Sequence, residues 1–267
     1  MKANYKNIKA NQNRPFGRFF CTLELHFGNF FLEKCDKISN VMNIALIVFA
    51  GIGSRITSSV PKQFVKINSK ELMVYAIERF NEHPLIDEIV LVTSKDYLGY
   101  AKNFVYMHRL NKVNHIVEGG KNRQESVRNG LNAVNYGDND IVLIHDGDRP
   151  FITTRLITKC IDELEGTNGV SPMIKHDDAL EEVSNSGRFI FKDGVRYDVQ
   201  TPQTFNYKLI KDLHNRLKDE EVSDDMSLLE SLGMDVKYIE GDVRNIKITT
   251  NIDLAYAKKV LLEFKDE

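Results

Sequence analysis

The residues whose types and spacing suggest chemistry begin in a glycine loop that follows the most apolar segment of the chain. Residues 43–49 read Asn-Ile-Ala-Leu-Ile-Val-Phe, and after them come Ala50-Gly51-Ile52-Gly53-Ser54-Arg55 and, seven residues further on, Lys62. An apolar run rich in β-branched residues predicts a buried parallel strand. Glycines at its end let backbone N–H groups approach a ligand closely. Because two cations follow, we expect a ligand with several negative charges, such as a polyphosphate.

This glycine loop matches neither of two common phosphate-binding motifs. A dinucleotide fingerprint needs a third glycine where this chain has Ile56. A P-loop needs a Gly-Lys-Ser or Gly-Lys-Thr sequence, and none follows. The failed fingerprint disfavours an NAD(P)-dependent reductase. Taken alone, the loop would equally suit an ordinary turn with a solvated arginine and lysine.

Four further clusters carry polar residues of chemical interest. The first pairs two glycines with a helix start, which exposes free N–H groups, and the second places carboxylates that could hold a hard cation at the end of a strand. In order, the clusters are Gly119-Gly120-Lys121-Asn122-Arg123-Gln124-Glu125-Ser126, His145-Asp146-Gly147-Asp148-Arg149-Pro150, Gln200-Thr201-Pro202-Gln203 and Asn245-Ile246-Lys247-Ile248-Thr249.

The elements that must position these clusters alternate between strand and helix. Hydrophobic patterning predicts strands at residues 43–49, 88–93, 113–117, 141–144, 169–173, 236–239 and 246–248, and helices near residues 73–80, 97–104, 127–134, 207–217, 226–232 and 254–261. Such alternation indicates a doubly wound α/β fold with a mostly parallel sheet and helices on both faces. Ligands bind such sheets beyond the carboxyl ends of the strands, which is where the loops after Phe49 and Ile144 lie.

Two segments depart from this alternation. Residues 1–41 show little periodicity, and charged residues interrupt every candidate signal sequence, so we expect a poorly ordered N-terminal extension before a single domain at 42–267. Residues 175–198 are polar and turn-rich, and Asp193-Gly194 is a hairpin signal. This second segment predicts a β-arm that projects from the domain.

Composition excludes several classes of protein. The chain has 267 residues and a formal net charge of -2, which does not suggest a nucleic-acid or membrane-surface protein. Its three cysteines form no Cys-x-x-Cys pair and no disulfide framework, so a reducing cytoplasm is the simpler expectation. No apolar run approaches the roughly 20 residues of a membrane helix.

In order and spacing, the glycine loop with Pro61-Lys62-Gln63 and the four clusters resemble the cytidylyltransferases of the methylerythritol-phosphate and ribitol-phosphate type. The resemblance runs from about Met42 to the C-terminus. It implies a nucleotidyltransferase (Rossmann-like) fold, CTP as substrate with Mg²⁺, a polyol phosphate as acceptor, and a homodimer built partly through the arm.

The resemblance also implies roles for individual residues. The triphosphate would lie over Ala50, Gly51 and Gly53, and Arg55 and Lys62 would neutralise it together with the leaving pyrophosphate. The residues implied for the cytosine and its neighbourhood are Gly120, Arg123 and Ser126.

The remaining implied residues lie nearer the reacting phosphates. Asp146 would bind either the ribose region or a metal-bound phosphate, and both alternatives stay open. Lys247 would lie near the α-phosphate, and Arg149, Thr201 and Ser223 would face the acceptor.

Some positions depart from the family pattern. Phe49 could crowd the base or could be the last core residue of its strand, and Asp148 adds a carboxylate near phosphates. In the arm, Asp178-Ala179 replaces the family's Asp-Thr pair, and Arg196 is offset from its phosphate-binding arginine. These arm differences favour ribitol 5-phosphate or a similar pentitol phosphate as acceptor. The alternatives are methylerythritol 4-phosphate and a nucleotide-binding module without turnover.

Overall fold

The computed structural model describes residues 41–51, 64–67, 69–176, 182–183, 189–190 and 195–261. The chain divides into residues 1–39 and residues 40–267, and every described residue belongs to the second unit. The expected N-terminal extension lies outside the described residues except for Val41, so it stays a prediction. Within the described residues, no helix is both long and apolar enough to span a bilayer.

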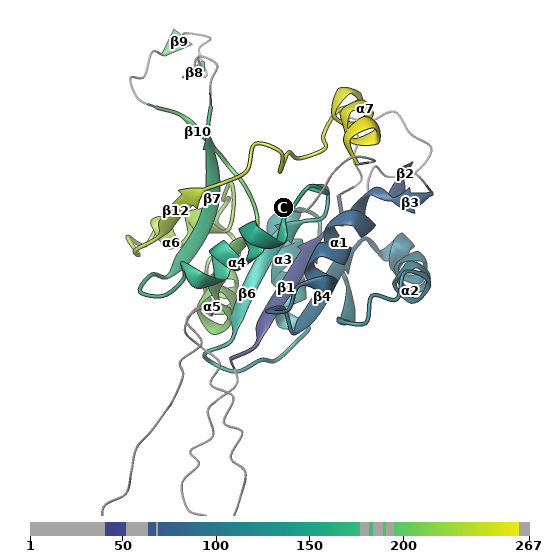
Figure 1. The fold of residues 1–267 in the computed structure, drawn as a ribbon. Helices are drawn as coiled ribbons and strands as arrows, with labels where there is room; N and C mark the ends of the chain where they lie inside the picture. The colour runs from purple at the N-terminus through teal and green to yellow at the C-terminus, as the bar shows by residue number, and fades with distance from the viewer. Residues whose placement is uncertain are drawn as a thin grey trace, which may run out of the picture. The chain divides into compact units, whose positions relative to one another are not determined.

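A mostly parallel sheet forms the centre of the domain, as the sequence predicts (Figure 1). The strand order is β10-β7-β11-β6-β1-β4-β5, and β12 pairs with β7. The strands are β1 (Asn43–Val48), β4 (Glu88–Thr93), β5 (Val113–Glu118), β6 (Ile141–Asp146), β7 (Gly169–Lys175), β10 (Tyr197–Val199), β11 (Gln203–Asn206) and β12 (Lys237–Glu240). Three further antiparallel contacts are local: β2 (Lys66–Ile67) with β3 (Lys70–Glu71), β8 (Glu182–Val183) with β9 (Phe189–Ile190), and β10 with β7.

Strand β11 is the main feature of the sheet that sequence patterning missed. It runs antiparallel to both β6 and β7 and lies between them. Its residues Gln203 and Thr204 are polar but buried, so the strand shows no apolar run that could be recognised. It directly follows Thr201-Pro202, which is a cis peptide bond.

Seven helices are found in the described part of the chain. Six agree with the predicted ranges, and the seventh, Thr154–Asp162, lies outside them. The helices are α1 (Leu72–Glu82), α2 (Leu98–Met107, preceded by a 3₁₀ turn at Lys95–Tyr97), α3 (Arg123–Asn132), α4 (Thr154–Asp162), α5 (Tyr207–Arg216), α6 (Met226–Glu230) and α7 (Asn251–Val260). Side-chain caps fix several starts: Asn122 accepts a hydrogen bond from the N–H of Glu125, and Thr250 and Asp253 form a capping box.

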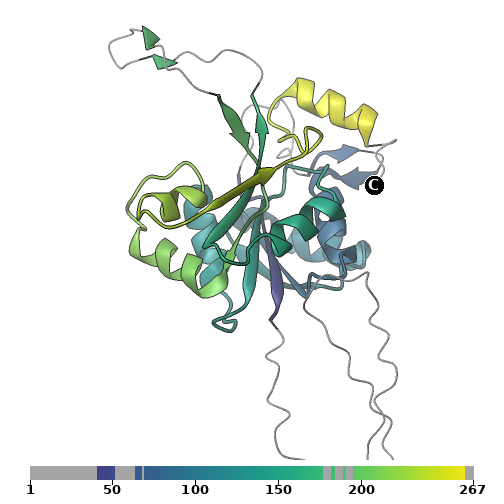
Figure 2. The same ribbon diagram turned by 60° about the vertical axis from the view of Figure 1, so that its left-hand side comes forward.

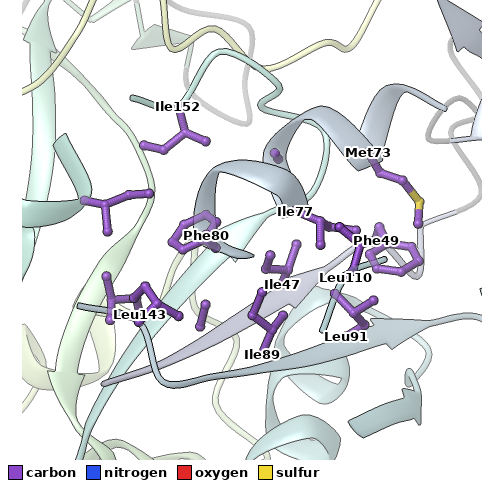
Figure 3. Close-up of a cluster of buried hydrophobic side chains, with 14 of the residues drawn as sticks. Ile47, Phe49, Met73, Ile77, Phe80, Ile89, Leu91, Leu110, Leu143 and Ile152 are labelled. Atoms are coloured by element: carbon purple, nitrogen blue, oxygen red, sulfur yellow. The ribbon is translucent and has the colours of Figure 1, made fainter. Parts of the chain in front are cut away.

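Helices cover both faces of the sheet. Side chains of β1 alternate between two cores, so that Ala45 and Ile47 pack with α1, α2 and α4, whereas Ile44 and Leu46 pack with α3, α5 and α6. Figure 3 shows the first core, in which Ile47 and Phe80 are labelled. Burying one such aliphatic side chain is worth about 1.5–3 kcal/mol. The two cores therefore hold β1 and the loop that follows it in place.

Phe49 belongs to the first core and ends it at the strand's carboxyl end. It is buried and makes an edge-to-face contact with Phe64 at 6.2 Å between ring centroids. It also lies 6.4 Å from Phe104 of α2. Of the two alternatives for Phe49, the structure therefore favours the second, that it is the last core residue of its strand.

The predicted strand at residues 246–248 is wrong. No ladder forms there, because the N–H of Ile246 bonds to Arg244 and that of Ile248 donates to the carbonyl oxygen of Asp148 at 2.9 Å. Ile248 is instead buried against α7 and Phe151. The extended segment between β12 and α7 crosses the sheet on the side of the strands' carboxyl ends (Figure 1), and Lys247 pairs there with Asp146 at the end of β6.

The arm begins where β7 ends. The chain leaves β7 at Lys175 and returns in β10, and the short β8–β9 pair lies past the ends of these strands (Figure 2). The hairpin signal at Asp193-Gly194 lies outside the described residues. His176, which the sequence places beside Asp177 and Asp178, pairs with Asp198 at 3.0 Å; those two aspartates also lie outside the described residues.

Candidate active site

The candidate site is built around Asp146, the last residue of β6. The register of β6 on β1 pairs Asp146 with Val48, so the carboxylate lies beside the start of the glycine loop. The side chain is only 9% exposed. Its backbone N–H donates to Oγ1 of Thr201 at 3.1 Å. Asp146 is thereby fixed at the carboxyl end of the sheet, where ligands of such folds bind.

Three cations surround the carboxylate of Asp146. Nε of Arg123 donates to Oδ1 at 2.8 Å, Nζ of Lys247 donates to Oδ2 at 2.9 Å, and Nε of Arg149 lies 3.7 Å from Oδ2. Burial raises the pKa of Asp146, but the charges of Arg123, Lys247 and Arg149 outweigh burial and hold that pKa well below its usual value. Even with Asp225, which pairs with Arg123, two carboxylates face three cations, and this excess of positive charge suits a polyanionic ligand.

Arg123 bridges Asp146 to a second carboxylate. It is the first residue of α3, and its Nη1 forms an ion pair with Oδ2 of Asp225 at 2.8 Å. Burial lowers the pKa of Arg123, but the carboxylates of Asp225 and Asp146 raise it by more. Asp225 stands at the N-cap of α6, but the neighbouring Asp224 caps the helix, since its Oδ1 accepts the N–H of Ser227.

Two glycine loops meet beside Arg123. A Cβ added to Gly119 would lie 2.4 Å from Cβ of Ala50 and 2.9 Å from Oγ of Ser126. The N–H of Gly120 donates to Oγ of Ser126 at 3.0 Å, and Ser126 in turn donates to the carbonyl oxygen of Asn122. The loops after β1 and β5 therefore touch, and Gly119 is required because no side chain fits between them.

Thr201 and His145 support Asp146 from within the protein. Oγ1 of Thr201 lies 3.0 Å from Nδ1 of the buried His145, whose Nε2 lies 3.3 Å from the carbonyl oxygen of Arg149. A carbonyl only accepts, so Nε2 carries the proton and Nδ1 accepts from Thr201. Burial lowers the pKa of His145 to about 4. His145 is thus a packed neutral residue, and it lies against Phe80.

Arg149 and Asn245 hold the segment that carries Lys247. Nη1 of Arg149 donates to the carbonyl oxygen of Asn245 at 2.8 Å, and Nη2 donates to that of Val199 at 3.3 Å. Nδ2 of Asn245 donates to the carbonyl oxygen of Thr201. Lys247 remains 36% exposed in its side chain, so its ammonium can reach a ligand.

The structure thus brings together most of the residues that the sequence singled out. Those gathered around Asp146 are Arg123, Arg149, Thr201 and Lys247, with Ala50, Gly120 and Ser126 beside Arg123. Ser223 lies two residues before Asp225, and its exposed side chain hydrogen-bonds to Ser227. Gly51 is described and exposed, whereas Gly53, Arg55 and Lys62 lie outside the described residues.

Sequence reasoning missed Asp225 and His214. Both side chains are almost completely buried, and Nε2 of His214 donates to Oδ1 of Asp225 at 3.0 Å. Neither residue belongs to a recognisable motif. The only signal in the sequence was that Asp225 lies close to α5 along the chain. This closeness does not show that the side chains of Asp225 and His214 touch until α5 and α6 are packed together.

The donor set suits a metal ion that arrives with a nucleotide. Among the described residues, no three His, Cys, Asp or Glu side chains cluster as metal ligands. Mg²⁺ at nucleotide sites is commonly held by one or two carboxylates together with phosphate oxygens. Asp146 can supply one such carboxylate. Chemically, the described residues of the site are therefore equipped to bind and neutralise phosphates.

Comparison with known proteins agrees with this chemistry. A sequence model described as 2-C-methyl-D-erythritol 4-phosphate cytidylyltransferase matches residues 43–263. A protein of that name from Clostridium novyi is 43% identical over 230 residues, which cover 84% of this chain and 98% of the relative. A Clostridium botulinum protein of the same name is 41% identical over 224 residues, covering 82% and 97%.

Solved structures show the same fold. The 4-diphosphocytidyl-2C-methyl-D-erythritol synthase of Anaerococcus prevotii superposes with a TM-score of 0.73 at 28% identity, covering 83% of this chain and 96% of its own. The 2-C-methyl-D-erythritol 4-phosphate cytidylyltransferase of Francisella tularensis gives 0.69 at 25% identity, covering 82% and 99%.

Proposed function

Since the chain belongs to the 2-C-methyl-D-erythritol 4-phosphate cytidylyltransferase family and is a CTP-dependent cytidylyltransferase, we propose that its acceptor is 2-C-methyl-D-erythritol 4-phosphate. In this reaction a phosphate oxygen of the acceptor bonds to the α-phosphorus of CTP. The bond from that phosphorus to the bridging oxygen breaks, and pyrophosphate leaves with the electron pair.

The preference for ribitol 5-phosphate that the arm suggested is not supported. Relatives at 43% and 41% identity carry the methylerythritol phosphate name. The family match at residues 43–263 also runs through the arm, so the departures at Asp178-Ala179 and Arg196 occur within a member of this family. A module without turnover is likewise disfavoured, because the matching relatives are named as enzymes.

The excess of positive charge around Asp146 is the single observation that supports the proposal most strongly. A phosphate monoester is mostly dianionic near neutral pH, with a second pKa of about 6. The acceptor therefore needs no general base, and the obstacle is the repulsion between two anions. Arg123 and Lys247 are held at the strand ends by Asp146. They can place positive charge where negative charge accumulates in the transition state.

The roles of these residues follow from their exposure and contacts. Lys247 is exposed enough to leave Asp146 and approach the α-phosphate, while Asp146 keeps it within reach beforehand. Arg149 and Thr201 use their polar atoms on protein partners. We therefore assign them to the support of Lys247 and Asp146, and their predicted contact with the acceptor remains a prediction. Arg55 and Lys62 keep their predicted role at the triphosphate.

We also propose that Mg²⁺ acts with CTP. Asp146 would hold the ion through its carboxylate, and the ion would neutralise charge on the phosphates. Both oxygens of Asp146 are already paired with Arg123 and Lys247. Asp146 can serve as a ligand only if one of these pairs opens, and the exposed Lys247 is the partner that can move away.

A homodimer through the arm is part of the same proposal. Strand β10 lies at one edge of the sheet order. It exposes apolar side chains, with Tyr197 at 48% and Val199 at 38% of their surface, and Val195 just before the strand is 62% exposed. Exposed apolar residues on an edge strand favour pairing with a further chain. Light scattering of the purified protein would show twice the mass of one chain if this is correct.

The experiment that tests the function is a comparison of acceptors. Pyrophosphate release is measured with CTP, Mg²⁺ and either methylerythritol 4-phosphate or ribitol 5-phosphate. We expect a higher kcat/KM with the former by at least about tenfold, since the loss of one contact to the polyol worth about 1.4 kcal/mol costs that much. Faster turnover of ribitol 5-phosphate would contradict the proposed acceptor and favour the one that the arm suggested. CTP binding without pyrophosphate release from either acceptor would contradict the proposed reaction.

A further inference from the structure

A buried carboxylate behind the site holds one side of Arg123. Asp225 lies at the start of α6 with its side chain 1% exposed. Its backbone N–H donates to Oε1 of Gln203 on β11 at 3.0 Å, which fixes the residue to the sheet. Its two carboxylate oxygens point to different partners, because Oδ1 accepts from His214 and Oδ2 is paired with Arg123.

This carboxylate does not cap its own helix, although it occupies the N-cap position. No side-chain cap hydrogen bond forms at Asp225, and the neighbouring Asp224 accepts the N–H and the hydroxyl of Ser227 instead. Burial raises the pKa of Asp225, but the charge of Arg123, with the hydrogen bond and charge of His214, lowers it overall. An ionised group buried this completely is costly to the fold unless it is paired. Its position is therefore explained by Arg123 and not by α6.

Two carboxylates hold the guanidinium of Arg123 from two sides. Nε donates to Oδ1 of Asp146, and Nη1 forms an ion pair with Oδ2 of Asp225, each at 2.8 Å. These contacts come from β6 and from the start of α6, which both pack in the core that contains Ile44 and Leu46. The third nitrogen, Nη2, has no hydrogen-bond partner among the described residues, and 28% of the side chain is exposed. The N–H groups of Nη2 are thus left for a ligand in a fixed orientation.

We propose that Asp225, supported by His214, is a positioning residue for CTP binding that acts through Arg123. It does not touch the nucleotide. It holds Arg123 so that Nη2 is presented to the nucleotide, while Asp146 remains shared with Lys247. This inference rests on the proposed function, because it assumes that CTP binds at the carboxyl ends of β1, β5 and β6.

The experiment measures the Kd of CTP with Mg²⁺ by calorimetry, with no acceptor present. The variants are Asp225→Asn, which keeps the shape and removes the charge, and Glu230→Gln, which removes an exposed charge from the other end of the same helix. We expect Asp225→Asn to weaken CTP binding by roughly 10- to 100-fold, the range that one hydrogen bond between charged groups supplies. Glu230→Gln should change the Kd less than about twofold, because Glu230 bonds to Tyr238 and shares no partner with Asp225 among the described residues.

A double-mutant cycle with Arg123→Met then separates positioning from general stability. If Asp225 acts through Arg123, Asp225→Asn should change the Kd by less than about twofold in the Arg123→Met background. An equal loss in both backgrounds would overturn the inference, and so would Asp225→Asn behaving like Glu230→Gln. Normal CTP binding without turnover of methylerythritol 4-phosphate would contradict the proposed acceptor alone. A wild-type protein that binds no CTP would overturn both proposals.

Discussion

Nζ of Lys247 lies 2.9 Å from Oδ2 of Asp146, although the two residues are 101 positions apart in the chain. The contact joins the end of β6 to the extended segment between β12 and α7. Arg149 fixes the same segment by donating a hydrogen bond to the carbonyl oxygen of Asn245. A mobile ammonium is thereby kept at a defined place beside the phosphate site, and its removal should affect chemistry more than folding.

Replacement of Lys247 by alanine should lower kcat by on the order of 10²–10³, by analogy with the loss of one preorganised donor in other enzymes. The fold should persist, because the side chain is partly exposed. Steady-state pyrophosphate release checks this, with Lys259→Ala on the exposed face of α7 as the matched control. We expect a similar loss for Lys62→Ala. Near-normal turnover of either active-site variant would remove that lysine from the mechanism.

Replacement of Gly119 by alanine should separate the two glycine loops. The new Cβ would meet Cβ of Ala50 at 2.4 Å, and overpacking of this kind typically costs about 1–3 kcal/mol. We expect a lower Tm and a weaker affinity for CTP. Gly99→Ala in α2 is the control, since no atom lies within 4 Å of its added Cβ. This control variant should stabilise the protein by about 0.5–1 kcal/mol. Equal behaviour of the two variants would show that the loops do not need their close contact.

Replacement of Thr201 by valine should destabilise the protein. The variant keeps the shape but removes the hydroxyl between the N–H of Asp146 and Nδ1 of His145. Leaving buried polar groups without partners costs about 1–3 kcal/mol each. Chemical denaturation monitored by circular dichroism measures this loss. Thr201→Ser, which retains the hydroxyl, should recover most of the stability, and a valine variant as stable as the serine variant would contradict the assignment.

His145 should make the free energy of unfolding depend on pH. Burial lowers its pKa from 6.5 to about 4 in the folded protein. Between these two values the unfolded chain binds more protons than the folded one, so stability must fall as the pH decreases from 6.5 to 4. The stability lost between neutral pH and pH 4 is about 3 kcal/mol, since one pKa unit corresponds to about 1.4 kcal/mol. Denaturant titrations at several pH values should show this decrease, and His145→Gln should flatten it.

Asp146 should add a second pH dependence at lower pH. Its folded pKa is depressed well below 3.8 by Arg123, Lys247 and Arg149, against the opposing effect of burial. The stability that this carboxylate contributes is present above its unfolded pKa of about 3.9. That contribution is lost as the pH falls toward the folded pKa. Asp146→Asn should remove this component below about pH 4, and an unchanged acid transition would show that the pairs contribute no net stability.

Local patterns predicted the elements that carry the phosphate loops. Strands β1, β4 and β6 show clear apolar runs, and the glycines after β1 and β5 mark the places where backbone must come close. Patterning was wrong at Ile246–Ile248, because alternation of apolar residues also fits an extended segment that packs against a helix. It missed β11, whose polar residues are buried by partners from distant parts of the chain.

The site was predictable where single residues belong to motifs and unpredictable where the partner is distant. Arg123 and Asp146 stand in recognisable strings, but the chain gives no sign that Asp225 pairs with Arg123 across 102 positions. His214 is similar, since its contact depends on how α5 packs on α6. Such pairs arise from tertiary packing, which local propensity does not encode.

The antiparallel strand β11 has a mechanical consequence. Hydrogen-bonded to β6 on one side and to β7 on the other, it joins the strands that lead to the glycine loops with those that lead to the arm. A sheet without these bonds could bend between the two groups of strands, but here the main-chain hydrogen bonds of β11 join them. The triphosphate of CTP and the acceptor phosphate would then meet on one rigid sheet. Any movement that closes the site would come from the loops at the carboxyl ends of the strands.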